Sequence, residues 1–282
     1  MLNDIIAINK IISTSAQVYF LVYIGNLDIG LDILKKIYSS QHYTTGNVFI
    51  VFKNMKLYHS IISTSLKNKL KFSYVTVLKR IDYGNDILPT LMLYNLVRKY
   101  IHHKYIIKVH TKSKTQWRNE CLNFLLDSNL NKLINSLKYN NCLCHPRYFK
   151  QLQNDKYNMK LVTKNADIIN PFKGFCAGSI FFCSNKVFDQ VLLHVIENFR
   201  CYFFFSNYDN NLINSDNSPP HFLERLFGVI EITNNKYSKF DHKYYVKHNQ
   251  DLPEDIKNCK IKSWKHFNNH GKFENRKHMF IN

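Results

Sequence analysis

Continuous apolar runs alternate with segments of helical periodicity along the first third of the chain. Residues 18–23, 47–52 and 74–78 have the composition of strands that are buried on both faces. Between them, residues 27–38 place apolar side chains on one helical face, and a second helical segment extends to Lys69. This order of strand, helix, strand, helix, strand predicts a doubly wound α/β fold.

A turn and a helix follow the third predicted strand. Gly84 can supply a positive φ for a sharp turn, Asp86 is placed as a helix N-cap, and Pro89 fits a first helical turn. A helix over residues 87–100 should therefore begin at the carboxyl edge of the sheet. Helix N-termini attract anions, so this edge is a candidate site for an anionic ligand. An ordinary capped turn is the alternative.

The next apolar run, residues 104–114, ends in cationic and hydroxyl side chains. These are Lys108, His110, Thr111, Lys112 and Lys114. Ligands of open α/β sheets bind beyond the carboxyl ends of the strands. Ammonium groups supply charge and hydroxyls supply directed hydrogen bonds, so this edge suits a ligand that carries phosphate. The alternative is a strand that leaves the core into a solvated basic loop.

The middle of the chain predicts further core elements. A leucine-rich face over residues 117–137 indicates one packed helix, and residues 140–170 are rich in loops. Residues 172–182 indicate a strand in which Gly178 allows close approach of a ligand or a neighbouring backbone. A helix over residues 186–199 should follow.

A polar loop then leads into a segment with paired ionisable groups. His221 and Glu224 are three residues apart and share a helix face, with Arg225 immediately beyond. A general base needs a carboxylate or imidazole that its neighbours hold in place, and this arrangement offers both. The alternative is a first-turn charge pair that caps the helix.

The last forty residues change in character, because aromatic residues are set among charges without a strand-like run. We therefore predict a main domain over residues 1–235 and a small helical module over residues 236–282.

Composition and charge narrow the possible partners. The chain has 282 residues, 45% hydrophobic residues and a net charge of +19, from 39 Lys and Arg against 20 Asp and Glu. This balance favours acidic partners, but the lysines are dispersed and the chain is rich in Asn and Ile, so nucleic acid is not the expected partner.

Seven cysteines without a regular framework indicate a reducing compartment. The Cys142–Cys144–His145 cluster reads as buried thiols in preference to a metal site. With no signal peptide and no transmembrane run, a soluble cytoplasmic protein is expected.

Taken in order, these motifs resemble the pattern of the rhamnan synthesis protein F family of glycosyltransferases over roughly residues 16–230. The first part of the pattern is carried by Gly84, Asp86, Ile87 and Pro89, then by Lys108, His110, Thr111 and Lys112, followed by Trp117 and Arg118. The second part is carried by Phe175, Ala177, Gly178 and Phe181, then by His221, Glu224, Arg225 and Leu226. The departures at Asp82, Ser184 and Asn185 bear on the donor sugar. Residues 240–280 resemble a short accessory module that often lies beside such transferases.

The resemblance implies a GT-A-like fold that moves a sugar, with rhamnose as a candidate, from a nucleotide-diphosphate donor to a carbohydrate acceptor with inversion. It implies donor contacts from Gly84, Asp86, Lys108, His110, Thr111 and Lys112. It implies Glu224 as the catalytic base, oriented by His221 and Arg225, with Asp209 and Asp216 in reserve. It implies a supporting role on the acceptor side for Trp117, Arg118, Gly178 and Arg225.

Many GT-A enzymes hold a divalent metal with an Asp-x-Asp motif at the end of the strand that here carries Lys108 and Lys112. This chain has no carboxylate pair there, so we expect lysines to neutralise the diphosphate directly and no cofactor to be needed. A divalent metal stays open as an alternative. From another class, the alternatives are a non-catalytic basic protein that binds polyanions or glycans, and a degenerate transferase that serves as a scaffold.

Overall fold

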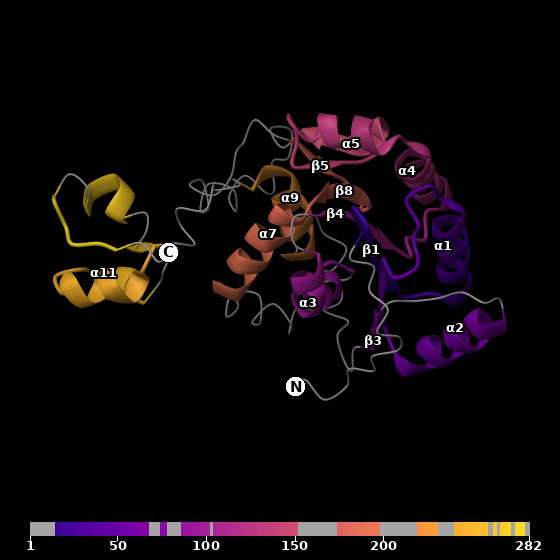
Figure 1. Cartoon of the computed structure of the whole chain (residues 1–282), viewed down its shortest axis with the longest axis horizontal. Helices are drawn as coiled ribbons and strands as arrows, with labels where there is room; N and C mark the ends of the chain where they lie inside the picture. Colours follow the sequence, from indigo (N-terminus) through magenta and orange to yellow (C-terminus); the bar gives the residue numbers. More distant parts are fainter. Residues whose placement is uncertain are drawn as a thin grey trace. The chain divides into compact units, whose positions relative to one another are not determined.

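The structure is a computed structural model of the whole chain (Figure 1). It describes residues 15–67, 74–77, 86–101, 104–151, 174–197, 219–230, 240–258, 262–263, 266–271 and 274–279. Three of the residues predicted for the site, Gly84, Asp209 and Asp216, lie outside these ranges. The chain divides into two compact units, Met1–Glu231 and Ile232–Asn282.

The first unit is built on a six-stranded sheet with the strand order β3-β2-β1-β4-β8-β5. Its strands are β1 (Val18–Ile24), β2 (Val48–Phe52), β3 (Tyr74–Val77), β4 (Tyr105–His110), β5 (Cys142–Leu143) and β8 (Phe181–Ser184). The first four strands in that order are parallel to one another, whereas β8 runs antiparallel to both β4 and β5. The expected α/β class is confirmed.

The parallel strands form because their side chains are apolar on both faces. Every residue of β2 is buried, and every residue of β1 except Tyr23 is buried. Helices cover the two sides of these strands, so the unit has three layers.

One helical layer contains α1 (Leu27–Ser39), α2 (Met55–Lys67) and α4 (Thr115–Asp127), and the other contains α3 (Ile87–Val97), α7 (Asn185–Glu197) and α9 (Pro219–Val229) (Figure 1). Because α1 and α3 leave the sheet on opposite sides, β1 and β4 lie at the point where the winding reverses. In doubly wound folds this point opens a crevice at the carboxyl ends of the strands.

The single helix predicted over residues 117–137 is wrong, because two helices occupy that segment. The first, α4, ends at Asp127, and α5 (Leu130–Ser136) follows. The side chain of Asn129 accepts hydrogen bonds from the backbone N–H groups of Asn131 and Lys132, which caps the second helix. Leucine periodicity continues through the break, so periodicity alone did not reveal it.

The single strand predicted over residues 172–182 is also wrong. β7 (Gly174–Cys176) pairs with β6 (Phe149–Gln151) in a separate two-stranded sheet, whereas β8 joins the main sheet. Between them lies a tight turn in which Gly178 has a φ of 82° and Ser179 a φ of 49°. These left-handed residues reverse the chain and end the first strand.

The second unit contains α11 (His242–His248), α12 (Glu254–Lys257) and one π-helical turn, η7 (Phe267–Gly271). Its own core consists of Phe240, Tyr245, Leu252 and Phe267. The Tyr245 hydroxyl also contacts His266 Nδ1 at 2.8 Å. Aromatic residues that appear isolated in the sequence thus form one small core.

Candidate functional site

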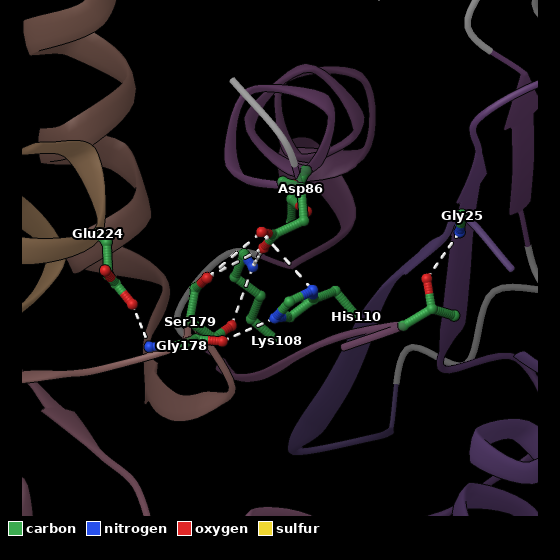
Figure 2. Close-up of polar contacts among 9 residues, drawn as sticks. Gly25, Asp86, Lys108, His110, Gly178, Ser179 and Glu224 are labelled. Carbon is green, nitrogen blue, oxygen red and sulfur yellow. Dashed lines mark hydrogen bonds and ion pairs between the residues drawn. The ribbon is translucent and has the colours of Figure 1, made fainter. Parts of the chain in front are cut away.

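Several of the predicted site residues meet at the carboxyl end of β4. Figure 2 shows this cluster, which combines the start of α3, the end of β4, the turn between β7 and β8, and α9. Its members are Asp86, Lys108, His110, Gly178, Ser179 and Glu224. The fold therefore brings together residues that are up to 138 positions apart in the sequence, from Asp86 to Glu224.

A buried ion pair lies at the centre of the cluster. The ammonium of Lys108 donates to Asp86 Oδ2 and, at 2.9 Å, to the backbone carbonyl of Ser179. Lys108 has no exposed surface, and Asp86 is 6% exposed. The Ser179 hydroxyl donates to Asp86 Oδ2 at 3.1 Å. A buried charge needs such partners, because an unpaired one is strongly unfavourable.

Asp86 occupies the predicted N-cap position of α3, but its side chain forms no capping hydrogen bond. Its carboxylate turns toward β4 instead, because Lys108 supplies a full charge there. Burial alone would raise the pKa of Asp86, but the electrostatic interaction with His110, which favours the carboxylate as the ring becomes protonated, the charge of Lys108, and hydrogen bonds from Lys108 and Ser179 hold it below its usual value. Burial lowers the pKa of Lys108, and Asp86 opposes that change.

His110 joins the same cluster through both ring nitrogens. Its Nε2 lies 2.7 Å from the carbonyl oxygen of Gly178, and its Nδ1 lies 3.6 Å from Asp86 Oδ1. A carbonyl only accepts, so Nε2 carries the proton. Burial lowers the pKa of His110 to about 4, against the opposing charge of Asp86, and the ring is therefore neutral at pH 7.

Glu224 holds the turn between β7 and β8 from the side of α9. Its Oε1 accepts a hydrogen bond from the backbone N–H of Gly178, and its Oε2 lies 3.5 Å from Arg225 Nη1. Close packing of α9 on β7 makes this contact possible, since a Cβ on Gly228 would lie 2.2 Å from the carbonyl oxygen of Gly174. Burial raises the pKa of Glu224, although the charge of Arg225 and the Gly178 hydrogen bond oppose the rise.

Arg225 is itself buried and has contacts on two sides. Its Nη1 donates to the backbone carbonyl of His221 at 2.9 Å, and its guanidinium lies 4.7 Å from the centre of the Phe175 ring. The predicted grouping of Glu224 and Arg225 on α9 is thus present, with both side chains directed into the interior. Through Glu224, they fix the turn that carries Gly178.

Thr111 links the ends of β4 and β1 at the point where the winding reverses. Its hydroxyl oxygen accepts a hydrogen bond from the backbone N–H of Gly25 at 2.8 Å (Figure 2). Its own N–H donates to the carbonyl of Tyr23 at 3.2 Å. Gly25 was not among the predicted site residues. The sequence showed only that the first strand ends at Gly25 and Asn26. It could not show that Gly25 lies beside Thr111, because that depends on the order of the strands in the sheet.

Arg118, predicted to support the acceptor, is buried below the basic loop. Its Nη1 donates to the carbonyl of Lys112 at 2.7 Å, and its Nη2 lies 3.8 Å from Asp32 Oδ2 on α1. Arg118 therefore holds the loop that follows β4 in place. Within the ranges that the structure describes, no group of three or more His, Cys, Asp or Glu side chains is arranged to hold a metal ion.

Fold and site define an α/β protein with a buried, ion-paired polar cluster at the carboxyl end of its central parallel strands. Neither a protein-family model nor a curated protein sequence matches the chain. Among the described helices, none is long and apolar enough to cross a membrane.

We expect Gly178→Ala to lower the free energy of unfolding by about 1–3 kcal/mol. Its φ of 82° disfavours a side chain, and an added Cβ would lie 2.9 Å from the Trp117 ring. Urea unfolding followed by circular dichroism measures the change. Gly46→Ala is the control. Gly46 has a similar φ of 95° but precedes the amino end of β2, whereas the candidate site lies at the carboxyl ends of the parallel strands. An equal or larger loss in Gly46→Ala would contradict the role given to the packing around Gly178.

Proposed function

We propose that the first unit is a glycosyltransferase that moves a sugar from a nucleotide-diphosphate donor to a carbohydrate acceptor on a GT-A-like sheet. The observation that supports this proposal is the convergence of motifs. Asp86, the residues 108–112, Gly178 and Glu224 belong to four separate parts of the family pattern, and all four meet at one sheet edge. Residues with unrelated structural roles would have no reason to collect at the edge where α/β folds bind ligands.

The contacts divide the basic residues into two groups. The ammonium of Lys108 is already paired with Asp86, so Lys108 holds the turn and does not meet the donor directly. Lys112 is partly exposed and Lys114 is exposed, so these lysines are the groups proposed to neutralise the diphosphate. Thr111, which precedes Lys112, is hydrogen bonded to the backbone N–H of Gly25 where the winding of the sheet reverses, and that is the position at which doubly wound folds bind ligands.

Glu224 is the proposed base that takes the proton from the acceptor hydroxyl, with Arg225 orienting it. The raised pKa of its carboxyl supports this role, because a base works best when its pKa approaches the working pH. A hydrogen bond from Gly178 to Oε1 and the contact of Arg225 Nη1 with Oε2 at 3.5 Å hold the carboxylate in place, and the second lone pair of Oε2 would take the proton. His221 stands on the same helix, with its carbonyl bonded to Arg225.

A degenerate transferase that binds a ligand without turnover is a second candidate. The observation in its favour is that both Lys108 and Glu224 are nine-tenths buried and hydrogen bonded within the chain. Buried polar groups whose hydrogen bonds are all made within the chain are typical of groups that stabilise a fold.

A donor screen separates these candidates. We expect one nucleotide sugar to release its nucleoside diphosphate in the presence of a glycan acceptor, with and without chelator, and the same diphosphate to raise the melting temperature. Glu224→Gln should reduce turnover by about a hundredfold or more while the protein stays folded. Binding without release for every donor would favour the degenerate transferase. Loss of activity on chelation, restored by manganese, would refute independence from metal.

A further inference from the structure

Lys112 is held in place at both its backbone and its tip. Its carbonyl accepts from the buried Arg118 at 2.7 Å, and its own N–H donates to the carbonyl of His110 at 2.9 Å. At the other end, Nζ lies 4.3 Å from the centre of the Trp117 ring. A lysine side chain on a surface loop ordinarily samples many rotamers; here the backbone bonds hold the loop, and the contact with the Trp117 ring favours the rotamers that keep Nζ beside it.

The charge of Lys112 is not neutralised as that of Lys108 is. In the part of the chain that the structure describes, the ion pairs of β4 and α4 involve Lys108, His110, Arg118 and Glu120, and no carboxylate lies within 4 Å of the Lys112 ammonium. Its ammonium therefore combines a restricted position with an unpaired positive charge. It interacts with the carboxylate of Glu224 only at longer range, so an anion that reaches the edge of the sheet can pair with it directly.

The Trp117 ring is itself fixed from its other side. The rings of Trp117 and Tyr148 stack at 4.3 Å with an angle of 5° between their planes. Glu120, one helical turn after Trp117, accepts a hydrogen bond from the Tyr148 hydroxyl at 2.8 Å. Tyr148 thus holds the indole in place, and of the two ammonium groups near its ring, that of Lys112 is nearer at 4.3 Å, against 5.8 Å for Lys114.

The same group packs against the turn of the candidate site. A Cβ on Gly178 would lie 2.9 Å from two atoms of the Trp117 ring and 3.1 Å from Lys112 Cε. The indole, the lysine stem and the Gly178 backbone thus form one close-packed unit. The position of the ammonium is thereby coupled to the turn that Glu224 and His110 also contact.

We propose that Trp117 is a positioning residue, whose ring, stacked on Tyr148, holds the ammonium of Lys112 where it binds the diphosphate of the donor. The inference rests on the proposed function for the identity of the ligand. Trp117 acts through Lys112 and has no polar contact with the ligand. Its indole N–H is buried and forms no hydrogen bond in the described part of the chain, which is consistent with a role for the ring faces alone.

The test uses inorganic pyrophosphate as the probe, with its dissociation constant measured by calorimetry on the full chain. We expect Lys112→Met to weaken binding about tenfold. Trp117→Leu should weaken it about two- to fivefold, and Trp117→Phe less. In the Lys112→Met background, Trp117→Leu should cause no further loss. An equal loss in both backgrounds would show that Trp117 does not act through Lys112 and would overturn the inference.

A spectroscopic readout reports on the same contact. The chain has two tryptophans, so in a Trp264→Phe background the emission comes from Trp117. Pyrophosphate should shift that emission, and Lys112→Met should abolish the shift. Lys99 and Tyr100 supply the matched control, because Lys99 Nζ lies 4.8 Å from the Tyr100 ring at the opposite end of β4. Tyr100→Leu should leave pyrophosphate binding unchanged.

The outcomes separate this inference from the proposed function. If a nucleotide sugar is turned over but Lys112→Met and Trp117→Leu bind pyrophosphate as the wild type does, the inference fails and the function stands. If pyrophosphate binds with the expected coupling but no nucleotide sugar is turned over, the function fails and the anion site stands. If the wild type does not bind pyrophosphate, the inference is wrong.

Discussion

Replacing Lys108 by Met is expected to lower the free energy of unfolding of the first unit by about 3–5 kcal/mol. The substitution keeps most of the apolar stem but leaves the carboxylate of Asp86 buried without its opposite charge. The hydroxyl of Ser179 and the neutral ring of His110 cannot replace that charge. Urea unfolding at pH 7, followed by circular dichroism, measures the loss.

Two further variants show whether the loss comes from the unpaired carboxylate. Adding Asp86→Asn to Lys108→Met should recover part of the stability, because it removes the buried charge. Lys36→Met is the control, since Lys36 and Asp32 form a half-exposed pair at 3.6 Å and should contribute about 1 kcal/mol or less. A loss below about 1 kcal/mol in Lys108→Met would mean that the buried pair does not stabilise the fold.

The first unit should also lose about 3 kcal/mol of stability through His110 as the pH falls from about 6.5 to about 4. In this range the unfolded chain binds a proton at His110 and the folded chain does not, because burial lowers the pKa of the folded state to about 4. The unfolded state therefore gains the proton, and stability decreases with acidification. Denaturant titrations at several pH values measure this dependence.

A His110→Gln variant isolates the contribution of this residue. Burial also lowers the pKa of His194 to about 4, so the wild type carries a second contribution of the same sign in the same range. The stability of the variant should depend less steeply on pH, because only His194 and the other histidines still contribute. Asp86 also makes the protein less stable on acidification, but in a lower pH range. Its stabilising contribution is present above a pH of about 4 and is lost as the pH falls through its lowered pKa. Identical pH dependence in wild type and variant would contradict a buried neutral His110.

Local patterns in the sequence were enough to predict the layers of the fold. The apolar runs gave the first three strands to within one residue at their ends, because a strand buried on both faces must be apolar at every position. Helix periodicity correctly predicted α1 and α7. It failed at Asn129, where a cap divides a helix without interrupting the leucine pattern, and at Gly178, where a left-handed turn divides a strand.

The candidate residues could be chosen from the sequence because charge, hydroxyl groups and glycine stand out at the ends of apolar runs. The residues with which they form ion pairs and hydrogen bonds could not be predicted from the sequence. The sequence shows Lys108 as one of several lysines at a strand end, whereas the fold buries it against Asp86 and leaves Lys112 as the cation held by Trp117. Gly178 and Glu224 meet only because α9 packs directly on β7.

The sequence by itself thus determined the first three strands, the helices α1 and α7, and which residues are candidates for the site, since these depend on neighbours a few positions away. Only the tertiary structure decided that the charge of Lys108 is neutralised by Asp86, whereas no ion pair forms at Lys112 in the described part of the chain. Asp86 and Lys108 are 22 residues apart, and Gly178 and Glu224 are 46 residues apart. Contacts over such separations depend on strand order and helix packing, which bring the groups within hydrogen-bonding distance after the chain has folded.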